Sequence, residues 1–424
     1  DITPVRGLTI SYHLGLNLDN TRYHYASSSM FGQSKAYGGE AVQEHMHTQA
    51  ITQQYMATYR NKFADVHSVD ALFAYETYDW RYEVSEASGQ NLYKEGDWSV
   101  YNTIDQRMGA GYYHKYAMRS WIGRLNYDYD ERYFASFSLR ADGSSRFHKD
   151  NRWGTFWSGS AAWNIARENF MKDQKWINFL KLRFSFGQNG NDRIGTSGYN
   201  QYYAYIDQYR MTGADGVFSD GTLVYKGNPD LTWEKSNAFD VAVDFEFWNG
   251  RLSGSIDYYN RTTKDMLYNK PVAVSNGYSS IPMNIGSMRN RGIEIDLHSQ
   301  IIKKANLRWN VDFNINHNSN EIIELAPELN GQLIDGTRIY REGQSMYEYY
   351  LVKYAGVNPA NGLALYWAKD SEGNEYATSD YSTARNTNRQ ATGNLQANWA
   401  GGIGTSLEAY GFDFSILADR KSVV

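Results

Sequence analysis

Residues 307–316 read Leu-Arg-Trp-Asn-Val-Asp-Phe-Asn-Ile-Asn, and this stretch decides the fold class. Its odd positions are apolar and its even positions are polar or charged. Successive side chains of a β-strand point to opposite faces, so such a strand has one apolar face and one polar face. The same alternation recurs in residues 121–129, 133–140, 237–247 and 293–298. The sequence therefore predicts an all-β protein built on an amphipathic sheet.

The composition excludes several other classes of protein. The 424 residues include 42 basic and 47 acidic side chains, a formal net charge of −5, and 16% aromatics with 36 Tyr. So high an aromatic share argues against disorder, and the acidic balance argues against nucleic-acid binding. The absence of Cys excludes disulfides and thiolate metal sites. The longest uninterrupted apolar stretch, residues 362–368, is far shorter than the roughly 20 residues of a transmembrane helix.

The predicted connections are of two lengths. Asn249-Gly250 is typical of a tight hairpin turn. Other short links are expected near residues 129–133, 301–306, 357–363 and 409–411, and long loops at roughly 83–114, 188–232, 262–288, 317–346 and 369–397. All six prolines fall in predicted loops or turns. Short turns on one side and long loops on the other are typical of a transmembrane β-barrel, here with about fifteen strands.

A soluble β-sandwich or propeller is the alternative, because its strands alternate too. Soluble strands are usually shorter, about 5–6 residues, and their polar faces are rarely so uniformly charged. Aromatic residues also cluster at the predicted strand ends: Tyr127, Tyr129 and Tyr133 flank one turn, and Phe247 and Trp248 flank another. Such rings suit the headgroup layer of a membrane. The pattern therefore favours the transmembrane antiparallel barrel.

Several motifs of this chain resemble the barrel of SusC/RagA-type TonB-dependent outer-membrane transporters. The motifs occur in order over residues 120–415: RADGSSRF at 140–147, NRWG at 151–154, AAWN at 161–164, LKLRFSFGQNGN at 180–191, NPDLTWE at 228–234, YYNRTTKD at 258–265, NIG at 284–286, NRGIE at 290–294, GGIG at 401–404 and GFD at 411–413. Any single motif is weak, but their order makes the resemblance specific.

The resemblance implies part of a 22-stranded barrel in the outer membrane of Bacteroidota. We expect residues 1–424 to be a partial barrel domain that lacks the N-terminal plug and the last strands. The implied function is active import of oligosaccharides or peptides, without enzymatic chemistry. The implied partners are a SusD-like surface lipoprotein that acts as a lid, TonB through the missing N-terminal region, and outer-membrane lipid. The alternatives are a soluble carbohydrate-binding or carbohydrate-cleaving β-domain and a passive porin or adhesin.

Aromatic loop residues are the candidate contacts for ligand or lid. Rings stack on the apolar faces of sugars, and neighbouring amides and carboxylates bind hydroxyl groups. The alternative is that these rings form small cores that hold the loops in shape. The candidates are Tyr93, Trp98, Tyr101, Tyr199, Tyr202, Tyr203, Tyr205 and Tyr209.

Charged residues on the polar strand faces are expected to face the lumen, where they hydrate the channel or contact a plug. They are Arg124, Arg140, Arg183, Asp240, Asp244, Glu294, Asp296 and Asp312.

Other polar motifs have a structural interpretation and a functional one. Residues 142–145 and 189–192 could form calcium or phosphate loops, but loop-base turns are the favoured interpretation. His45 and His47 lie on one face of a predicted strand near Glu44, without further ligands at zinc spacing. No nucleophile, P-loop or acid/base motif is present, so neither catalysis nor a metal or other cofactor is expected.

Overall fold

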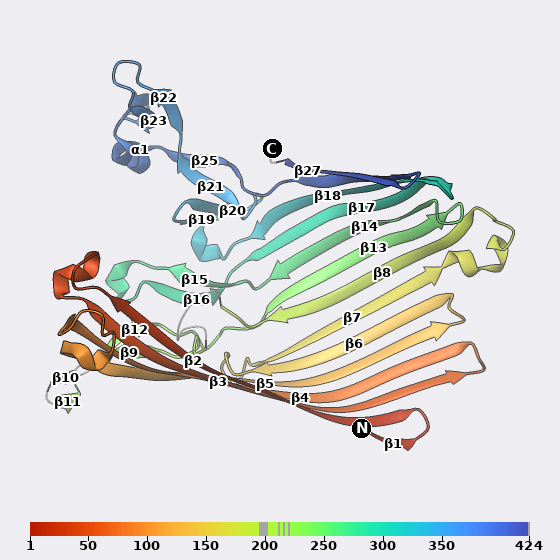
Figure 1. Cartoon of the computed structure of the whole chain (residues 1–424), viewed down its shortest axis with the longest axis horizontal. Helices are drawn as coiled ribbons and strands as arrows, with labels where there is room; N and C mark the ends of the chain where they lie inside the picture. Colours follow the sequence, from red (N-terminus) through yellow and green to blue (C-terminus); the bar gives the residue numbers. More distant parts are fainter. Residues whose placement is uncertain (195–201, 211–212, 215–216, 219–220, 423–424) are drawn as a thin grey trace.

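Fourteen strands of this computed structural model form one sheet in which each strand pairs antiparallel with the next (Figure 1). The structure describes residues 1–194, 202–210, 213–214, 217–218 and 221–422. The fourteen strands are β1 (Ile2–Val5), β2 (Leu8–Ser27), β3 (Glu40–Phe63), β4 (His67–Leu92), β5 (Thr103–Tyr129), β6 (Tyr133–Ser144), β7 (Trp153–Asn164), β8 (Ile177–Asn191), β13 (Glu234–Phe247), β14 (Leu252–Lys264), β17 (Ser287–Lys304), β18 (Leu307–Glu324), β26 (Trp399–Ala409) and β27 (Phe412–Ser422).

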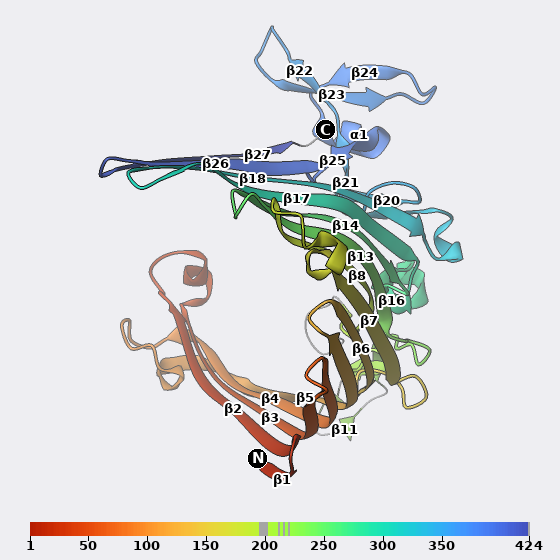
Figure 2. The same cartoon turned by 90° about the vertical axis from the view of Figure 1, so that its right-hand side faces the viewer.

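The sheet bends into an open arc, with short turns at one end of its strands and long loops at the other (Figures 1 and 2). The predicted antiparallel amphipathic sheet is therefore confirmed, with fourteen strands in place of about fifteen. No helix in the described part of the chain is long and apolar enough to cross a membrane.

Strand register separates the apolar from the polar side chains across the whole arc. Val243, for example, pairs with Leu182 and Ile256, whereas Asp244 pairs with Lys181 and Ser255. A curved sheet crowds the side chains on its concave side and separates those on its convex side. On β6 the apolar residues Phe137 and Leu139 are 50% and 45% exposed, whereas the alternating polar residues Ser136, Ser138 and Arg140 are less exposed. The polar face is therefore the inner face of the arc.

Aromatic rings border the apolar outer face near the turns. His67, Tyr129, Tyr133 and Trp163 form a row with centroid separations of 5.0, 6.2 and 6.5 Å. Farther along the same edge, Trp176 lies 5.3 Å from Phe247 and 6.0 Å from Trp248. These rings include the aromatic pairs that the sequence placed around turns.

A second aromatic row crosses the outer face nearer the loops. Tyr12, Tyr55, Tyr75 and Trp121 follow one another at centroid separations of 5.0, 6.3 and 4.4 Å. On β5, Trp121 and Tyr129 are 129 − 121 = 8 residues apart, about 27 Å along a strand. Strand tilt reduces this to roughly 20 Å, comparable with the apolar band of about 25 Å on membrane barrels.

The loop end carries smaller elements. They are η1 (Gln33–Tyr37), η2 (Val100–Asn102), β9 (Gln208–Arg210), β10 (Gly213–Ala214), β11 (Val217–Phe218), β12 (Thr222–Tyr225), β15 (Leu267–Pro271), η6 (Val274–Asn276), β16 (Ser280–Asn284), η7 (Pro327–Leu329), β19 (Gln332–Asp335), β20 (Arg338–Arg341), β21 (Glu348–Val352), β22 (Tyr354–Val357), β23 (Ala364–Lys369), β24 (Glu375–Thr378), α1 (Tyr381–Thr387) and β25 (Arg389–Asn394). The short 3-10 helices η3 (Ile165–Arg167) and η4 (Asn169–Met171) link β7 and β8 at the turn end.

Three predictions, two about connections between strands and one about the prolines, are corrected. Residues 83–92 and 103–114 belong to β4 and β5, so the predicted loop 83–114 shrinks to residues 93–102. Residues 357–363 contain the turn between β22 and β23, in a three-stranded sheet outside the main sheet. Pro4, Pro271 and Pro282 lie in β1, β15 and β16. Proline is tolerated there because these short strands lie at an edge or in a two-stranded hairpin.

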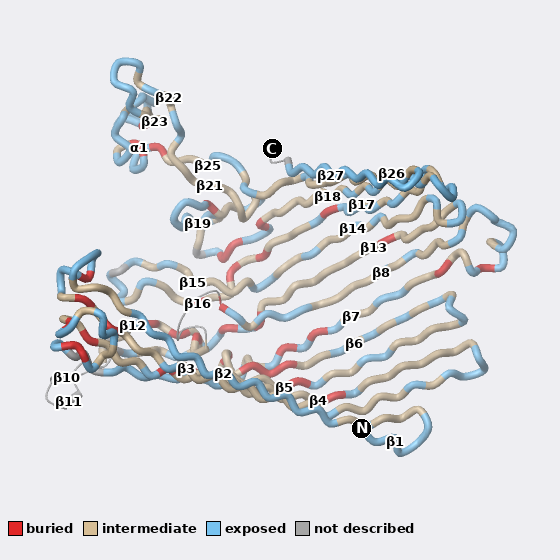
Figure 3. Tube along the Cα trace, in the orientation of Figure 1, coloured by how far each residue is buried: buried red, intermediate tan, exposed pale blue. Residues whose placement is uncertain are grey.

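A small apolar core closes the loop end of β5–β8, where buried residues gather (Figure 3). Its members are Phe147, Phe156, Ile194, Ala204, Leu231 and Trp233. The Phe156 ring lies against Gly190, where any Cβ would overlap the ring. Trp233 also donates its indole N–H to the carbonyl of Arg152 at 2.9 Å. This core ties the chain around Ala204 to the sheet.

Candidate functional site

The inner face carries cross-strand ion pairs along the arc. Arg183 on β8 donates to Asp244 on β13 at 2.6 and 2.9 Å and to Asp257 on β14 at 3.0 Å. Three strands are thereby joined through one guanidinium group. Because Asp257 has the same phase as the predicted lumen residues, the alternation could have identified it as well.

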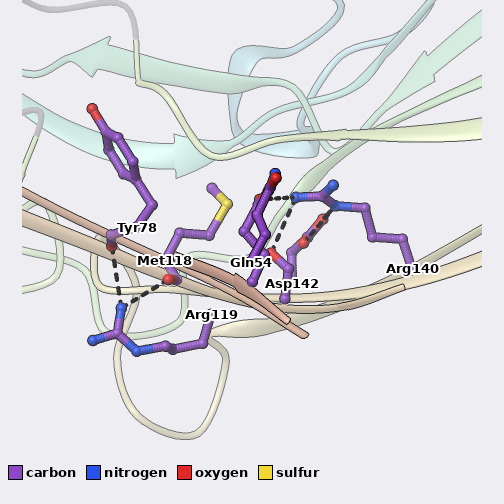
Figure 4. A network of polar contacts seen from close by, with 8 residues as sticks. Gln54, Tyr78, Met118, Arg119, Arg140 and Asp142 are labelled. Atoms are coloured by element: carbon purple, nitrogen blue, oxygen red, sulfur yellow. Dashed lines mark hydrogen bonds and ion pairs between the residues drawn. The ribbon is translucent and has the colours of Figure 1, made fainter. Parts of the chain in front are cut away.

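A second polar network centres on Arg140 (Figure 4). Its guanidinium donates to both oxygens of Asp142 at 2.7 and 2.8 Å, to Glu76 at 3.3 Å and to Ser120 at 3.1 Å. Gln54 on β3 donates to the other oxygen of Glu76 at 2.5 Å. The network therefore spans β3 to β6. Figure 4 shows the Arg119 guanidinium on the opposite side of the sheet from these groups.

Register places all eight predicted lumen residues on this polar face. Besides Arg140, Arg183 and Asp244, Arg124 lies 3.6 Å from Asp70, and Asp312 contacts His298 at 2.5 Å. Asp240 accepts a hydrogen bond from Ser185 at 3.1 Å.

Two hollows lie on the inner face. One, of about 900 Å³ at the turn end, is lined by residues that include Arg60, Asp70, Asn126 and Ser136. The other, of about 500 Å³ between β14 and β27, is lined by residues that include Glu294, Asp296, Asn314 and Asp419. Polar walls of this kind suit water, a polar solute or another protein segment.

Tyr202 and Tyr203 pack against the sheet at its loop end. The ring of Tyr202 stacks on Trp80 and His114, with centroids 5.2 and 5.0 Å apart. Tyr203 accepts a hydrogen bond from the backbone N–H of Lys115 at 3.3 Å. These contacts favour the alternative interpretation, in which the rings hold the loop in shape.

Arg146 and Asp192 fix the start of this loop. The Arg146 guanidinium lies 4.4 Å from the ring centroid of Tyr116 and 3.0 Å from Asp192. Asp192 also accepts hydrogen bonds from Ser144 at 2.6 Å and from Tyr116 at 2.8 Å. The predicted loop-base turns are corrected, because residues 142–144 lie in β6 and residues 189–191 lie in β8. Ser144 and Asp192 are nevertheless used in the protein's own contacts.

The other candidate rings differ in exposure. Tyr93 and Tyr101 are 81% and 91% exposed in the β4–β5 loop, and Trp98 lies nearby at 43%. Tyr209 on β9 is exposed, and Tyr205 lies edge-on to His148 at 6.0 Å. Tyr199 lies outside the described residues. The exposed rings of the β4–β5 loop are therefore the better candidates for contacts with another molecule.

Hydrogen bonds to a neighbouring loop hold the β4–β5 loop. Glu95 accepts bonds from the hydroxyl and backbone N–H of Ser29 at 2.6 and 3.2 Å. Hydrogen bonds from Ser28 and Ser29 lower the pKa of Glu95 below its ordinary value. The β2–β3 loop adds an exposed ring of its own, Phe31. No sequence motif indicated Phe31, because only the register of β2–β4 brings the two loops together.

An apolar hollow of about 300 Å³ lies at the loop end of β14–β18. Its lining includes Met266, Leu267, Met288, Ile322 and Met346. These residues come from distant parts of the sequence, so no local motif could indicate the hollow.

The histidine pair near Glu44 is not brought together with further ligands. His47 contacts the Asn20 side chain at 2.7 Å. Within the described ranges, no three His, Asp or Glu side chains are grouped for metal binding.

Comparisons with known proteins agree with this architecture. Residues 4–410 match the profile of the family described as "TonB dependent receptor-like, beta-barrel". The chain is similar to TonB-dependent receptor P39 of Formosa agariphila, with 32% identity over 356 residues, covering 83% of this chain and 33% of that protein. It is also similar to TonB-dependent receptor SusC of Bacteroides thetaiotaomicron, with 33% identity over 291 residues, covering 65% of this chain and 28% of SusC.

Among solved structures, the chain resembles one described as the RagAB peptide transporter. The TM-score is 0.82 at 27% identity, and the match covers 99% of this chain and 46% of that one. The chain spans about a third of the length of the curated relatives P39 and SusC.

Proposed function

The chain belongs to the TonB-dependent receptor β-barrel family, and we propose that it forms part of the wall of an outer-membrane importer of oligosaccharides or peptides. The family places the chain in the outer membrane as a transmembrane β-barrel. This membership argues against the soluble β-domain considered from the sequence. We infer that residues 1–424 act as one unit of that wall and catalyse no reaction.

The observation that carries this proposal is the contrast between the two faces of the arc. The outer face is an apolar band between aromatic rows, which suits lipid. The inner face is joined by ion pairs such as Arg183–Asp244 and contains polar hollows. A wall of this kind separates lipid from a hydrated path, as an importer requires.

The order of events that we propose is capture, closure and passage. The exposed rings Tyr93 and Tyr101 bind cargo or a closing partner at the loop end. A SusD-like surface lipoprotein is the proposed partner, because SusC and the RagAB peptide transporter are among the similar proteins. Energy from TonB is proposed on the basis of the family. The cargo then passes along the polar inner face.

Growth and uptake assays on the full-length gene test this function. Deleting the gene should abolish growth on its cargo, oligosaccharides or peptides, and removing TonB should have the same effect. Uptake that persists without TonB would instead indicate a passive porin.

A loop variant tests the proposed role of the rings. Replacing Tyr93 and Tyr101 together with Ala should reduce uptake while leaving barrel stability unchanged, because both rings are almost free of protein contacts. Unchanged uptake would contradict the assignment of these rings.

A further inference from the structure

The outer face of β2–β5 continues past the loop-side aromatic row. Asp79, Arg81, Lys115 and Arg119 have the same register phase as the row members Tyr75 and Trp121, so they lie on the outer face. Asp79 and Arg81 are four and six residues beyond Tyr75, about 13 and 20 Å along a strand. Because aromatic rows mark the membrane interface and the longer loops of such barrels are extracellular, these charges lie at the headgroups of the outer leaflet.

This outer patch is basic although the chain is acidic overall. Over residues 20–24, 45–49, 77–83 and 113–119, the outward phase contains Arg22, Arg81, Lys115 and Arg119 but only two carboxylates, Asp79 and Glu83. It also contains three histidines. The local excess of cations contrasts with the net charge of −5 of the whole chain.

A hollow of about 350 Å³ lies within this patch. Its lining includes Gln49, Arg81, Lys115, Tyr203 and Tyr205, together with Asp79, whose carboxylate is paired with Arg119. The two tyrosines come from the loop after β8, which passes the edge of β5 where Tyr203 bonds to Lys115. The hollow therefore combines two cations with aromatic rings, beside the membrane.

The cations differ in how far the protein itself neutralises them. Arg119 donates to Asp79 at 2.9 Å and to two backbone carbonyls, and Arg81 pairs with Glu83. Lys115 lies 5.2 Å from the ring centroid of Tyr113 and makes no ion pair within the described part of the chain. Its charge is available to an anion from outside.

We propose that this hollow binds the phosphorylated sugar headgroup of an outer-leaflet glycolipid. Lys and Arg are the usual partners of phosphate groups, and tyrosine rings pack on sugar faces. The position of the hollow, its two cations and its aromatic lining thus indicate the same ligand. The site is separate from the polar inner face that the import function uses.

Lipid binding to the purified full-length protein tests the proposal. The probe is lipid A in detergent micelles, titrated against wild type and the R81E/K115E variant, with dephosphorylated lipid A and inorganic phosphate as separate arms. We expect phosphorylated lipid A to bind wild type at least about tenfold more tightly than the variant, because two charge-assisted contacts are lost.

A matched control carries the same charge change at the turn end. K303E/K304E alters two exposed lysines at the end of β17 and should bind lipid A like wild type. Heat-modifiable migration on SDS gels confirms that both variants are folded. Equal binding by wild type and R81E/K115E would overturn the proposal. So would inorganic phosphate binding as tightly as the lipid, or dephosphorylated lipid A binding as well as the phosphorylated form.

Discussion

A lysine at Val243 gives the sharpest test of which face of the sheet contacts lipid. Val243 lies on the outer face midway between Phe239 and Phe247 of the same strand. A lysine there is four residues from either end of this outward apolar run, so extending its side chain toward either interface gives little relief. We expect Val243→Lys to destabilise the folded barrel.

The magnitude follows from the position in the apolar band. Lys or Arg on the lipid face costs about 2–4 kcal/mol at the membrane midplane. Since about 1.4 kcal/mol corresponds to a factor of ten, the folding equilibrium should fall roughly 30- to 700-fold.

The control is Ser255→Lys on the neighbouring strand. Ser255 lies on the inner face, where its register partners are Asp244 and Asp296. A lysine there gains two nearby carboxylates, so its cost should stay within about 1 kcal/mol. Equilibrium unfolding of the full-length protein in liposomes, followed by gel mobility and tryptophan fluorescence, measures both variants. Equal costs for the two lysines would refute the assignment of the faces.

Three further predictions concern the loop end. Gly190→Ala should cost about 1–3 kcal/mol in the unfolding assay, because the new methyl group overlaps the buried Phe156 ring, whereas Gly123→Ala, which meets open space, should cost much less. Tyr202→Ala should lower stability by roughly 2 kcal/mol through lost stacking, and an unchanged unfolding midpoint would contradict its structural role. The lowered pKa of Glu95 means that its contribution to stability is present above the ordinary carboxyl pKa and is lost as pH falls through the folded-state value. The protection of the β2–β3 loop against hydrogen exchange, measured relative to the intrinsic exchange rate at each pH, should therefore fall at acidic pH, and Glu95→Gln should show no such fall.

The alternation predicted the wall of the barrel because one face of the sheet suits lipid and the other suits water. Val311 and Asp312 are adjacent in sequence but contact different surroundings, so their side chains encode the phase directly. The same rule placed Arg183 and Asp244 on one face before any geometry was known. The Asn249-Gly250 hairpin between β13 and β14 was predicted from its turn residues, and both have positive φ angles in the structure.

The loop end was less predictable, because no fixed period describes it. Residues 83–92 of β4 extend beyond the aromatic row, where the outer face no longer needs apolar side chains and the alternation fades. Tyr202 and Tyr101 look alike in sequence, yet one ring stacks on the sheet and the other is almost fully exposed. Only contacts between distant segments distinguish a structural ring from an available one.

Each strand of the large sheet pairs with the next strand of that sheet along the chain. This holds even where long excursions, meaning the loops and small sheets at the loop end, separate β8 from β13 and β18 from β26. An excursion can therefore lengthen, shorten or be exchanged without shifting the register of any strand beside it. Under the import function proposed here, this independence suits evolutionary diversification, because selection for a new nutrient can act on the excursions alone. Lineages adapting to different diets would then diverge most at the cell surface while the framework beneath them stayed constant.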